Sequence, residues 1–191
     1  MKRCPVRVNR FWSIICLCRG SYLYSLKQAN RQRAFMSTLS RSKFITTFAD
    51  ELLPRLPESL QQMQVRRRWS WLVQFHVGEP RLHYELSRAA RRHNGIDGWE
   101  IGFHCEARDK QLNRYLLRGF RRHLFEIKDT LGDAIEAEMW DKGWTKIYEV
   151  VPMAPLTTRY QQQVAARLAD IIRCLHPIYV DLRSDITRIH R

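Results

Sequence analysis

The stretch EAEMWDKGWTKIYEVV, residues 136–151, predicts a β-hairpin. Two runs in which polar and apolar side chains alternate flank an Asp-Lys-Gly tripeptide at 141–143, and a period of two is the pattern of a β-strand. A three-residue hairpin loop commonly needs a left-handed last residue, which Gly143 adopts without steric cost. We therefore expect Trp140 and Trp144 to pair across the neck of the hairpin. The alternative for these two rings is an aromatic clamp for a base.

The same alternation extends upstream of the hairpin. Alternating segments predict five strands in all, at about residues 69–77, 82–87, 99–106, 135–139 and 146–150. The turn sequence Gly-Glu-Pro at 78–80 separates the first two strands, and the polar segment 88–98 is expected to form a loop. Short connections between neighbouring strands favour an antiparallel sheet.

Helical periodicity appears before, between and after these strands. The predicted helices cover about residues 40–53, 109–131 and 158–176. Asp109 and Gly132 are the expected cap and stop of the second helix, and Thr158 with Gln161 has the spacing of a capping box for the third, which should end before Pro177. The sequence therefore predicts an α+β fold: a two-layer sandwich with a mostly antiparallel five-stranded sheet and helices on one face.

Charge and cysteine content suggest how the chain is divided. The formal net charge is +14, eight basic residues lie in the first 35 positions, and no acidic residue precedes Asp50. We expect residues 1–35 to be a basic tail or sequence upstream of a start at Met36, and residues 36–191 to be a single domain; a targeting segment or a functional basic arm are the alternatives. The cysteines lack the spacing of a zinc site, which favours a reducing, cytoplasmic location.

Two surfaces are candidates for function, and the first is basic. Arginines that repeat every four residues along the second helix form a stripe that could follow a phosphate backbone. The residues expected to bind nucleic acid are Arg114, Arg118, Arg122, Arg121, Arg67 and Arg68. The ordinary alternative is a solvated, charged helix face.

The second candidate is the polar face of the sheet. If the apolar positions all meet the helices, the opposite face carries His76, His83, Glu85, Glu100, His104, Glu106, Glu136 and Glu138. Histidines and carboxylates can bind a divalent metal or perform acid–base chemistry, and the best-placed set is His83, Glu85, Glu100, His104 and Glu106. The alternative is an ordinary outer face whose glutamates are solvated or paired with arginines. No phosphate loop, nucleophile elbow or HExxH helix is present, so no cofactor and no specific catalytic residue is expected.

The segment from Trp99 to Glu149 carries one resemblance to known proteins. It reads WEIGFHCEARDKQLNRYLLRGFRRHLFEIKDTLGDAIEAEMWDKGWTKIYE, and its landmarks are Asn113, the Leu-Gly pair at 131–132, Trp140 and Trp144. It resembles the strand, helix and hairpin core of small uncharacterised bacterial α+β proteins, similar to domains found beside restriction-endonuclease-like modules. The resemblance implies a bacterial, cytoplasmic protein without assigned chemistry. No nuclease domain accompanies the segment here.

These observations favour a small binding or interaction domain, associated with nucleic acid through the basic helix stripe. A metal-dependent, nuclease-like hydrolase that uses the His/Glu face of the sheet is one alternative. A homodimer closed through the uncovered sheet is another. The apolar run near the N-terminus is shorter than the roughly 20 residues that span a bilayer, so no membrane partner is expected.

Overall fold

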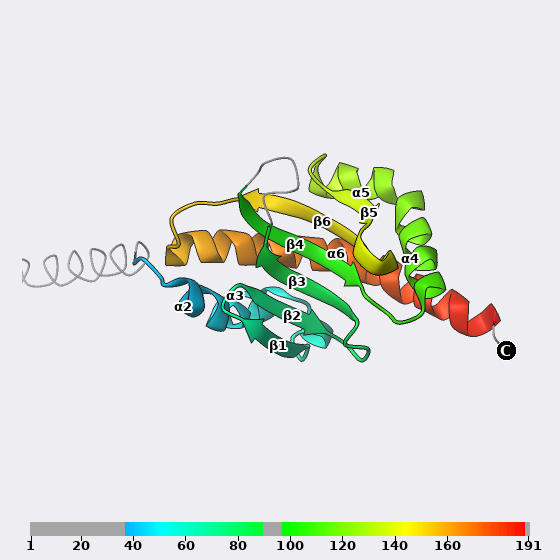
Figure 1. Cartoon of the computed structure of the whole chain (residues 1–191), viewed down its shortest axis with the longest axis horizontal. Coiled ribbons are helices and arrows are strands. Elements are labelled where there is room, and N and C mark those ends of the chain that lie inside the picture. Colours follow the sequence, from blue (N-terminus) through cyan, green and yellow to red (C-terminus); the bar gives the residue numbers. More distant parts are fainter. Residues whose placement is uncertain (1–36, 90–96, 190–191) are drawn as a thin grey trace, which may run out of the picture. The chain divides into compact units, whose positions relative to one another are not determined.

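The computed structural model describes residues 37–89 and 97–189, and its centre is an antiparallel sheet of six strands (Figure 1). The strand order is β1-β2-β3-β4-β6-β5, and every neighbouring pair is antiparallel. The strands are β1 (Gln64–Trp69), β2 (Leu72–His76), β3 (Leu82–Arg88), β4 (Gly98–Cys105), β5 (Glu136–Met139) and β6 (Thr145–Pro152). The fold is therefore α+β with an antiparallel sheet.

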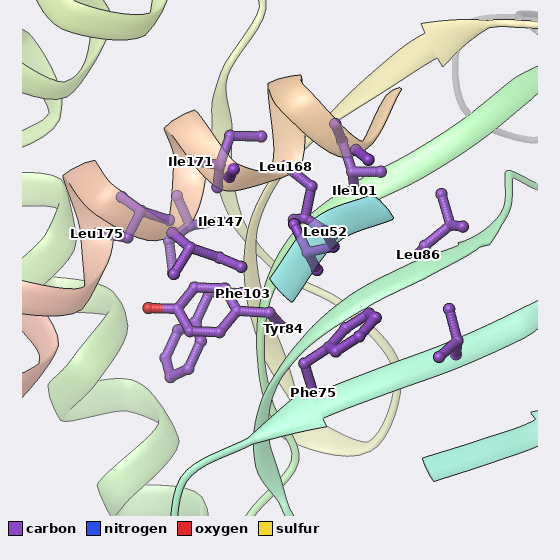
Figure 2. Packing of buried hydrophobic residues seen from close by; sticks show 14 of the residues in the cluster. Leu52, Phe75, Tyr84, Leu86, Ile101, Phe103, Ile147, Leu168, Ile171 and Leu175 are labelled. Atoms are coloured by element: carbon purple, nitrogen blue, oxygen red, sulfur yellow. The ribbon is translucent and has the colours of Figure 1, made fainter. Parts of the chain in front are cut away.

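Helices contact the apolar face of this sheet. They are α2 (Arg41–Thr46), α3 (Phe48–Leu52), α4 (Lys110–Arg122), α5 (Leu124–Leu131) and α6 (Thr158–Ile189), with short 3-10 turns η1 (Leu53–Arg55), η2 (Glu58–Leu60) and η3 (Asp141–Gly143). Figure 2 shows Leu52 of α3 and Leu168 of α6 packed beside residues of the central strands. Phe103 of β4 is typical of the core, because its ring lies within 5.7 Å, centroid to centroid, of Tyr84 and Phe120.

The prediction of five strands is wrong by one, and the error lies at the first strand. Residues 69–77 were expected to continue straight, but the chain reverses at Ser70 and Trp71, so that β1 and β2 form a hairpin with Trp69 opposite Leu72. No Gly, Pro, Asn or Asp marks this turn. Most of β1 is exposed at the edge of the sheet, where apolar alternation is not needed, which explains why its pattern was missed.

The second predicted helix is present but divided. Asp109 caps α4 by accepting a hydrogen bond from Gln111 N, and Gly132 ends α5 with φ of 93°, as expected. Between them the helix is interrupted at His123, whose φ of −98° and ψ of 9° are not helical. The two parts therefore point in different directions in Figure 1.

The last helix is longer than expected. α6 continues through Pro177 to Ile189, so the predicted end before Pro177 is wrong. An interior proline costs about 3 kcal/mol, and the packing of Ile178, Tyr179 and Leu182 on the core offsets that cost. The predicted capping box is also wrong: the Thr157 hydroxyl accepts from Tyr160 N, while Gln161 donates from its side chain to Phe44 O of α2.

The β5–β6 hairpin confirms the prediction from the opening stretch. Gly143 has φ of 77°, and Trp140 N donates to Trp144 O at 2.8 Å across the neck. The two indole rings lie 5.4 Å apart, centroid to centroid. Lys142 is also left-handed, with φ of 58°, which tightens the loop into the single turn η3.

Two sets of predictions fall outside the described residues. One is the expected boundary between a tail of residues 1–35 and a domain of residues 36–191. The other is most of the predicted loop, at residues 90–96. Within the described ranges, no helix combines the length and the apolar character needed to cross a bilayer.

Candidate functional site

The centre of the sheet's polar face is buried. His83, Glu85, Glu100 and His104 are each less than 10% exposed. The alternative of solvated or arginine-paired glutamates does not hold for Glu85 and Glu100: Glu85 contacts His83 and Gln74, and Glu100 contacts His104 and Lys146. Glu136 is exposed, as that alternative expects. Cross-strand register explains part of this, because Gln74 lies opposite Glu85, His83 opposite His104, and His104 opposite Lys146.

Four of these side chains form a compact cluster. His83, Glu85, His104 and Glu106 each offer a ligand atom, and the four atoms lie within 4.8 Å of one another. His83 and His104 are direct cross-strand partners on β3 and β4, and their rings stack at 5.7 Å. The first three side chains are buried, whereas Glu106 is partly exposed. Glu100, the fifth residue of the predicted set, lies beside the cluster, with one carboxylate oxygen 3.4 Å from His104 Nε2.

The hydrogen bonds of His83 direct its other ring nitrogen into the cluster. His83 Nδ1 lies 3.0 Å from Pro80 O, and a carbonyl only accepts, so Nδ1 is the donor. In the neutral ring Nε2 then carries a lone pair, which faces Glu85 Oε2 at 3.2 Å. The Gln74 amide lies 2.9 Å from each of these two acceptors and donates to both, which holds them side by side.

His104 lacks the partners that a buried imidazole normally has. Among the described residues, neither of its ring nitrogens makes a hydrogen bond, although the side chain is only 2% exposed. Buried polar atoms are nearly always satisfied, so each exception requires an explanation. The ring lies edge-on to Trp140, and its nitrogens face Glu100 and Glu106, the latter at 4.0 Å.

Glu85 is held in its ionised form. Burial alone raises the pKa of a carboxyl group, but the charge of nearby His104 and the hydrogen bond with His83 outweigh it and lower the pKa of Glu85 to about 2. The Gln74 amide also donates to Glu85 Oε2 at 2.9 Å. A carboxylate fixed in this way is ready to act as a ligand.

Lys146 is the charged centre of the neighbouring part of the face. Its Nζ lies 2.8 Å from Glu100 Oε2 and 3.5 Å from Glu138 Oε1, and 3.7 Å from the centre of the Tyr148 ring. The side chain is 2% exposed. Lys146 was not among the predicted site residues; the available signal was its position in the hairpin, where it lies opposite Glu138.

Gly102 makes the contacts across this face possible. In an extended strand, residues four apart lie about 13 Å apart, yet His104 and Glu100 approach to 3.4 Å by leaning over the residue between them. That residue is Gly102, and a Cβ there would lie only 2.2 Å from Ile147 O and 2.7 Å from Tyr148 Cβ. The missing side chain therefore lets β4 and β6 lie close together at the place where these polar side chains meet.

The cluster lies in a groove with a volume of about 780 Å³. Arginines and tryptophans line it together with the carboxylates and histidines of the sheet: Arg66, Arg68, Arg81, Arg88, Trp69, Trp71, Trp140 and Trp144. Arg88 is paired with Asp97. Within residues 37–89 and 97–189, no carboxylate forms an ion pair with the side chains of Arg66, Arg68 or Arg81.

The predicted basic stripe lies on a different surface. Arg114, Arg118 and Arg122 are exposed on α4, whose opposite side packs on the apolar face of the sheet. Arg121 instead donates two hydrogen bonds to Ala137 O of β5.

The predicted pair Arg67 and Arg68 is also divided. Arg68 lines the groove, whereas Arg67 does not and lies opposite Val73, a core residue. The structure thus brings the predicted histidines and glutamates together, but it separates the predicted arginines.

Comparison with known proteins gives no match: no family pattern, no curated relative and no solved structure is significantly similar to this chain. The resemblance to bacterial domains found beside nuclease-like modules therefore stays a prediction. Functional inference depends on the arrangement of side chains in the groove.

Proposed function

We propose that this protein is a divalent-metal-dependent hydrolase of phosphate esters, with its metal held by His83, Glu85, His104 and Glu106. The observation that carries the proposal is the convergence of these four ligand atoms within 4.8 Å at the floor of an arginine-lined groove. The cation would take the place of the Gln74 amide between two facing acceptors, His83 Nε2 and Glu85 Oε2.

The size of the cluster fits a first-row metal ion. With metal–ligand distances of about 2.1 Å, two ligand atoms on opposite sides of a metal lie about 4.2 Å apart. A contraction of roughly half an ångström would bring the four atoms to that separation. Two imidazoles and two carboxylates suit Mn²⁺, Fe²⁺ or Zn²⁺ better than Mg²⁺ or Ca²⁺, which prefer oxygen ligands alone.

The surroundings of the cluster favour a phosphate ester as substrate. A cation there would act as a Lewis acid on a phosphoryl oxygen. Arg66, Arg68 and Arg81 line the same groove and can neutralise the remaining phosphate charge. In the hydrolysis, the oxygen of water bonds to phosphorus, the ester P–O bond breaks, and the leaving oxygen takes up a proton.

The proposal also needs an accessible sheet face. We propose that the helices form one layer on the apolar face, as in a two-layer sandwich, so that a substrate reaches the cluster through the opposite face. Exposed Trp69 and Trp71 at the groove, and the partial exposure of Glu106, support this arrangement.

Calorimetric titration of the full chain with Mn²⁺ tests the metal site, because thiols bind this ion weakly and the chain has five cysteines. We expect about one Mn²⁺ per chain, and a gain of about 2.7 kcal/mol in unfolding free energy at a hundredfold excess over Kd. His104→Ala should remove this binding. His123→Ala, which changes an exposed histidine between α4 and α5, is the matched control and should retain it.

Hydrolysis of bis(para-nitrophenyl) phosphate with and without Mn²⁺ tests the activity. We expect turnover that requires the metal and is lost in His104→Ala but not in His123→Ala. Equal Mn²⁺ affinity in the two variants would show that the cluster is not the metal site. Metal binding without turnover of this diester would leave a metal site and contradict the hydrolase.

A further inference from the structure

Two tryptophans at the turn between β1 and β2 form an exposed aromatic pair. The Trp69 and Trp71 rings are stacked, with centroids 4.9 Å apart and planes 6° from parallel. They are 54% and 40% exposed, and both line the groove. Leaving two indoles in water gives up favourable burial, and a stacked, solvent-facing pair offers a flat surface on which a further ring can stack.

Positive charge lies next to this pair. Arg66 and Arg68 precede Trp69 on β1 and line the groove with it, and Arg81 lies across the groove at the turn between β2 and β3. No ion pair within the described parts of the chain neutralises these three side chains. Alternating basic and aromatic side chains are the combination that binds phosphates and bases together.

The groove has a second aromatic pair at its other end. Trp140 and Trp144 are half-buried at the neck of the β5–β6 hairpin, and the Nε1–H of Trp140 is buried without a hydrogen-bond acceptor among the described residues. β1 and β5 are the two edge strands, five spacings apart, which is about 24 Å at 4.8 Å per spacing. The distance from one pair to the other exceeds the length of one nucleotide.

We propose that the groove binds a single-stranded nucleic acid that crosses the polar face of the sheet. One base stacks on the Trp69–Trp71 pair, Arg66 and Arg68 contact the adjoining phosphates, and the strand continues past the His/Glu cluster to Trp140. The inference rests on the proposed function for its chemistry, because it names the phosphodiester that the metal would act on. Binding through the tryptophans and arginines needs no metal.

Fluorescence anisotropy of labelled oligothymidine and oligouridine of about 12 nucleotides tests the proposal. The full chain is used, in EDTA and at low salt, so that the result does not depend on the metal. We expect binding whose logarithm falls linearly with the logarithm of salt concentration. Trp69→Ala should weaken binding about tenfold, since one stacked base contributes roughly 1–3 kcal/mol.

A pair of charge variants separates the groove from the helix stripe. Arg66→Gln/Arg68→Gln removes two positive charges from the groove, and Arg114→Gln/Arg118→Gln removes two from α4. The loss of two single-strand phosphate contacts lowers the salt slope by about 1.4, and we expect this in the groove variant alone. The basic residues of positions 1–35 are common to both variants and cancel in the comparison.

Three results would overturn the inference. The first is an unchanged affinity for the oligomers in Trp69→Ala and in Arg66→Gln/Arg68→Gln, together with a loss of affinity in Arg114→Gln/Arg118→Gln. The second is a mononucleotide that competes as well as the oligomer, since the groove would then be a nucleotide pocket. The third is equal affinity for duplex and single strands, because paired bases cannot stack on the indoles. Binding that persists in EDTA when Mn²⁺ titration fails would support this inference and refute the hydrolase.

Discussion

The two faces of the central sheet are both buried, but they are stabilised differently. On one face Phe103 and its neighbours pack against helices α3, α4 and α6. On the other, His83, Glu85 and Lys146 are equally buried, yet they contact mainly side chains of the sheet itself and of the turns at its ends. The apolar face gains free energy by leaving water, whereas the polar face pays for desolvation and recovers that cost through matched charges.

Stability alone accounts for the residues of the apolar face but not for those of the polar face. Replacing a buried ion pair by apolar residues is often neutral or stabilising, so folding by itself does not demand His83, Glu85, Glu100, His104 and Lys146 on one surface. The proposed metal and phosphate ester would use these charges and would supply the missing reason. Three measurements of stability test this contrast between the two faces.

The largest loss is expected on the apolar face. Phe103→Ala removes a ring that contacts Tyr84, Phe120 and Tyr179 and is 1% exposed. Chemical denaturation should show a loss of about 4 kcal/mol in unfolding free energy. Phe125→Ala is the matched control, because that ring is 82% exposed, and its effect should stay within about 0.5 kcal/mol. Similar losses in the two variants would contradict the packing described here.

The next effect is expected at the charged centre of the polar face. Lys146→Met leaves Glu100 and Glu138 without their common cation in a buried site, and removing one partner of such a pair costs about 3 kcal/mol. Adding Glu100→Gln to the same chain should recover part of the loss, since the uncompensated charge is then gone. The contrary outcome is a double variant that is less stable than Lys146→Met by as much as Glu100→Gln alone destabilises the unsubstituted chain. The two side chains would then act independently, and the unpaired charge of Glu100 would not explain the loss.

A smaller loss is expected where the polar face approaches the backbone. Gly102→Ala places a Cβ 2.2 Å from Ile147 O, and backbone cannot move aside cheaply, so we expect a loss of about 2 kcal/mol. Gly119→Ala is the control, because the three atoms nearest to its Cβ belong to the side chain of Leu182, which can turn aside as backbone cannot, and alanine favours the helix. Thermal or urea unfolding of the two variants should differ clearly. Equal stability would mean that β4 and β6 have more freedom than the close approach implies.

The sequence predicted the elements that obey a strict period and missed those that do not. The alternation of polar and apolar residues predicted β3, β4 and the β5–β6 hairpin. The ability of glycine to adopt a positive φ predicted the turn at Gly143. The β1–β2 hairpin was missed because β1 is an exposed edge strand with charged residues and does not alternate polar with apolar residues. The continuation of α6 through Pro177 was missed because tertiary packing outweighs the local cost of an interior proline.

For the candidate site, the sequence predicted which side chains share a face of the sheet, but not which residues contact one another across the strands. Parity along each strand predicted that His83, Glu85, His104 and Glu106 share one face. The alternation did not predict that these side chains are buried, because alternation alone predicts a solvent-exposed outer face. Their burial depends on which residues lie opposite them on the neighbouring strands. The contacts of Lys146 and Gln74 depend on register, which no single strand encodes.

The position of α6 in the chain has a consequence for the order in which the protein folds. This helix is the last described element, yet it supplies the residues that cover the apolar face and, through Gln161, binds the carbonyl of Phe44 near the other end of the domain. On the ribosome, every strand emerges before α6, although α3 and α4 have by then been made. We therefore expect nascent chains that stop short of α6 to expose an uncovered apolar sheet and to depend on chaperones until synthesis is complete.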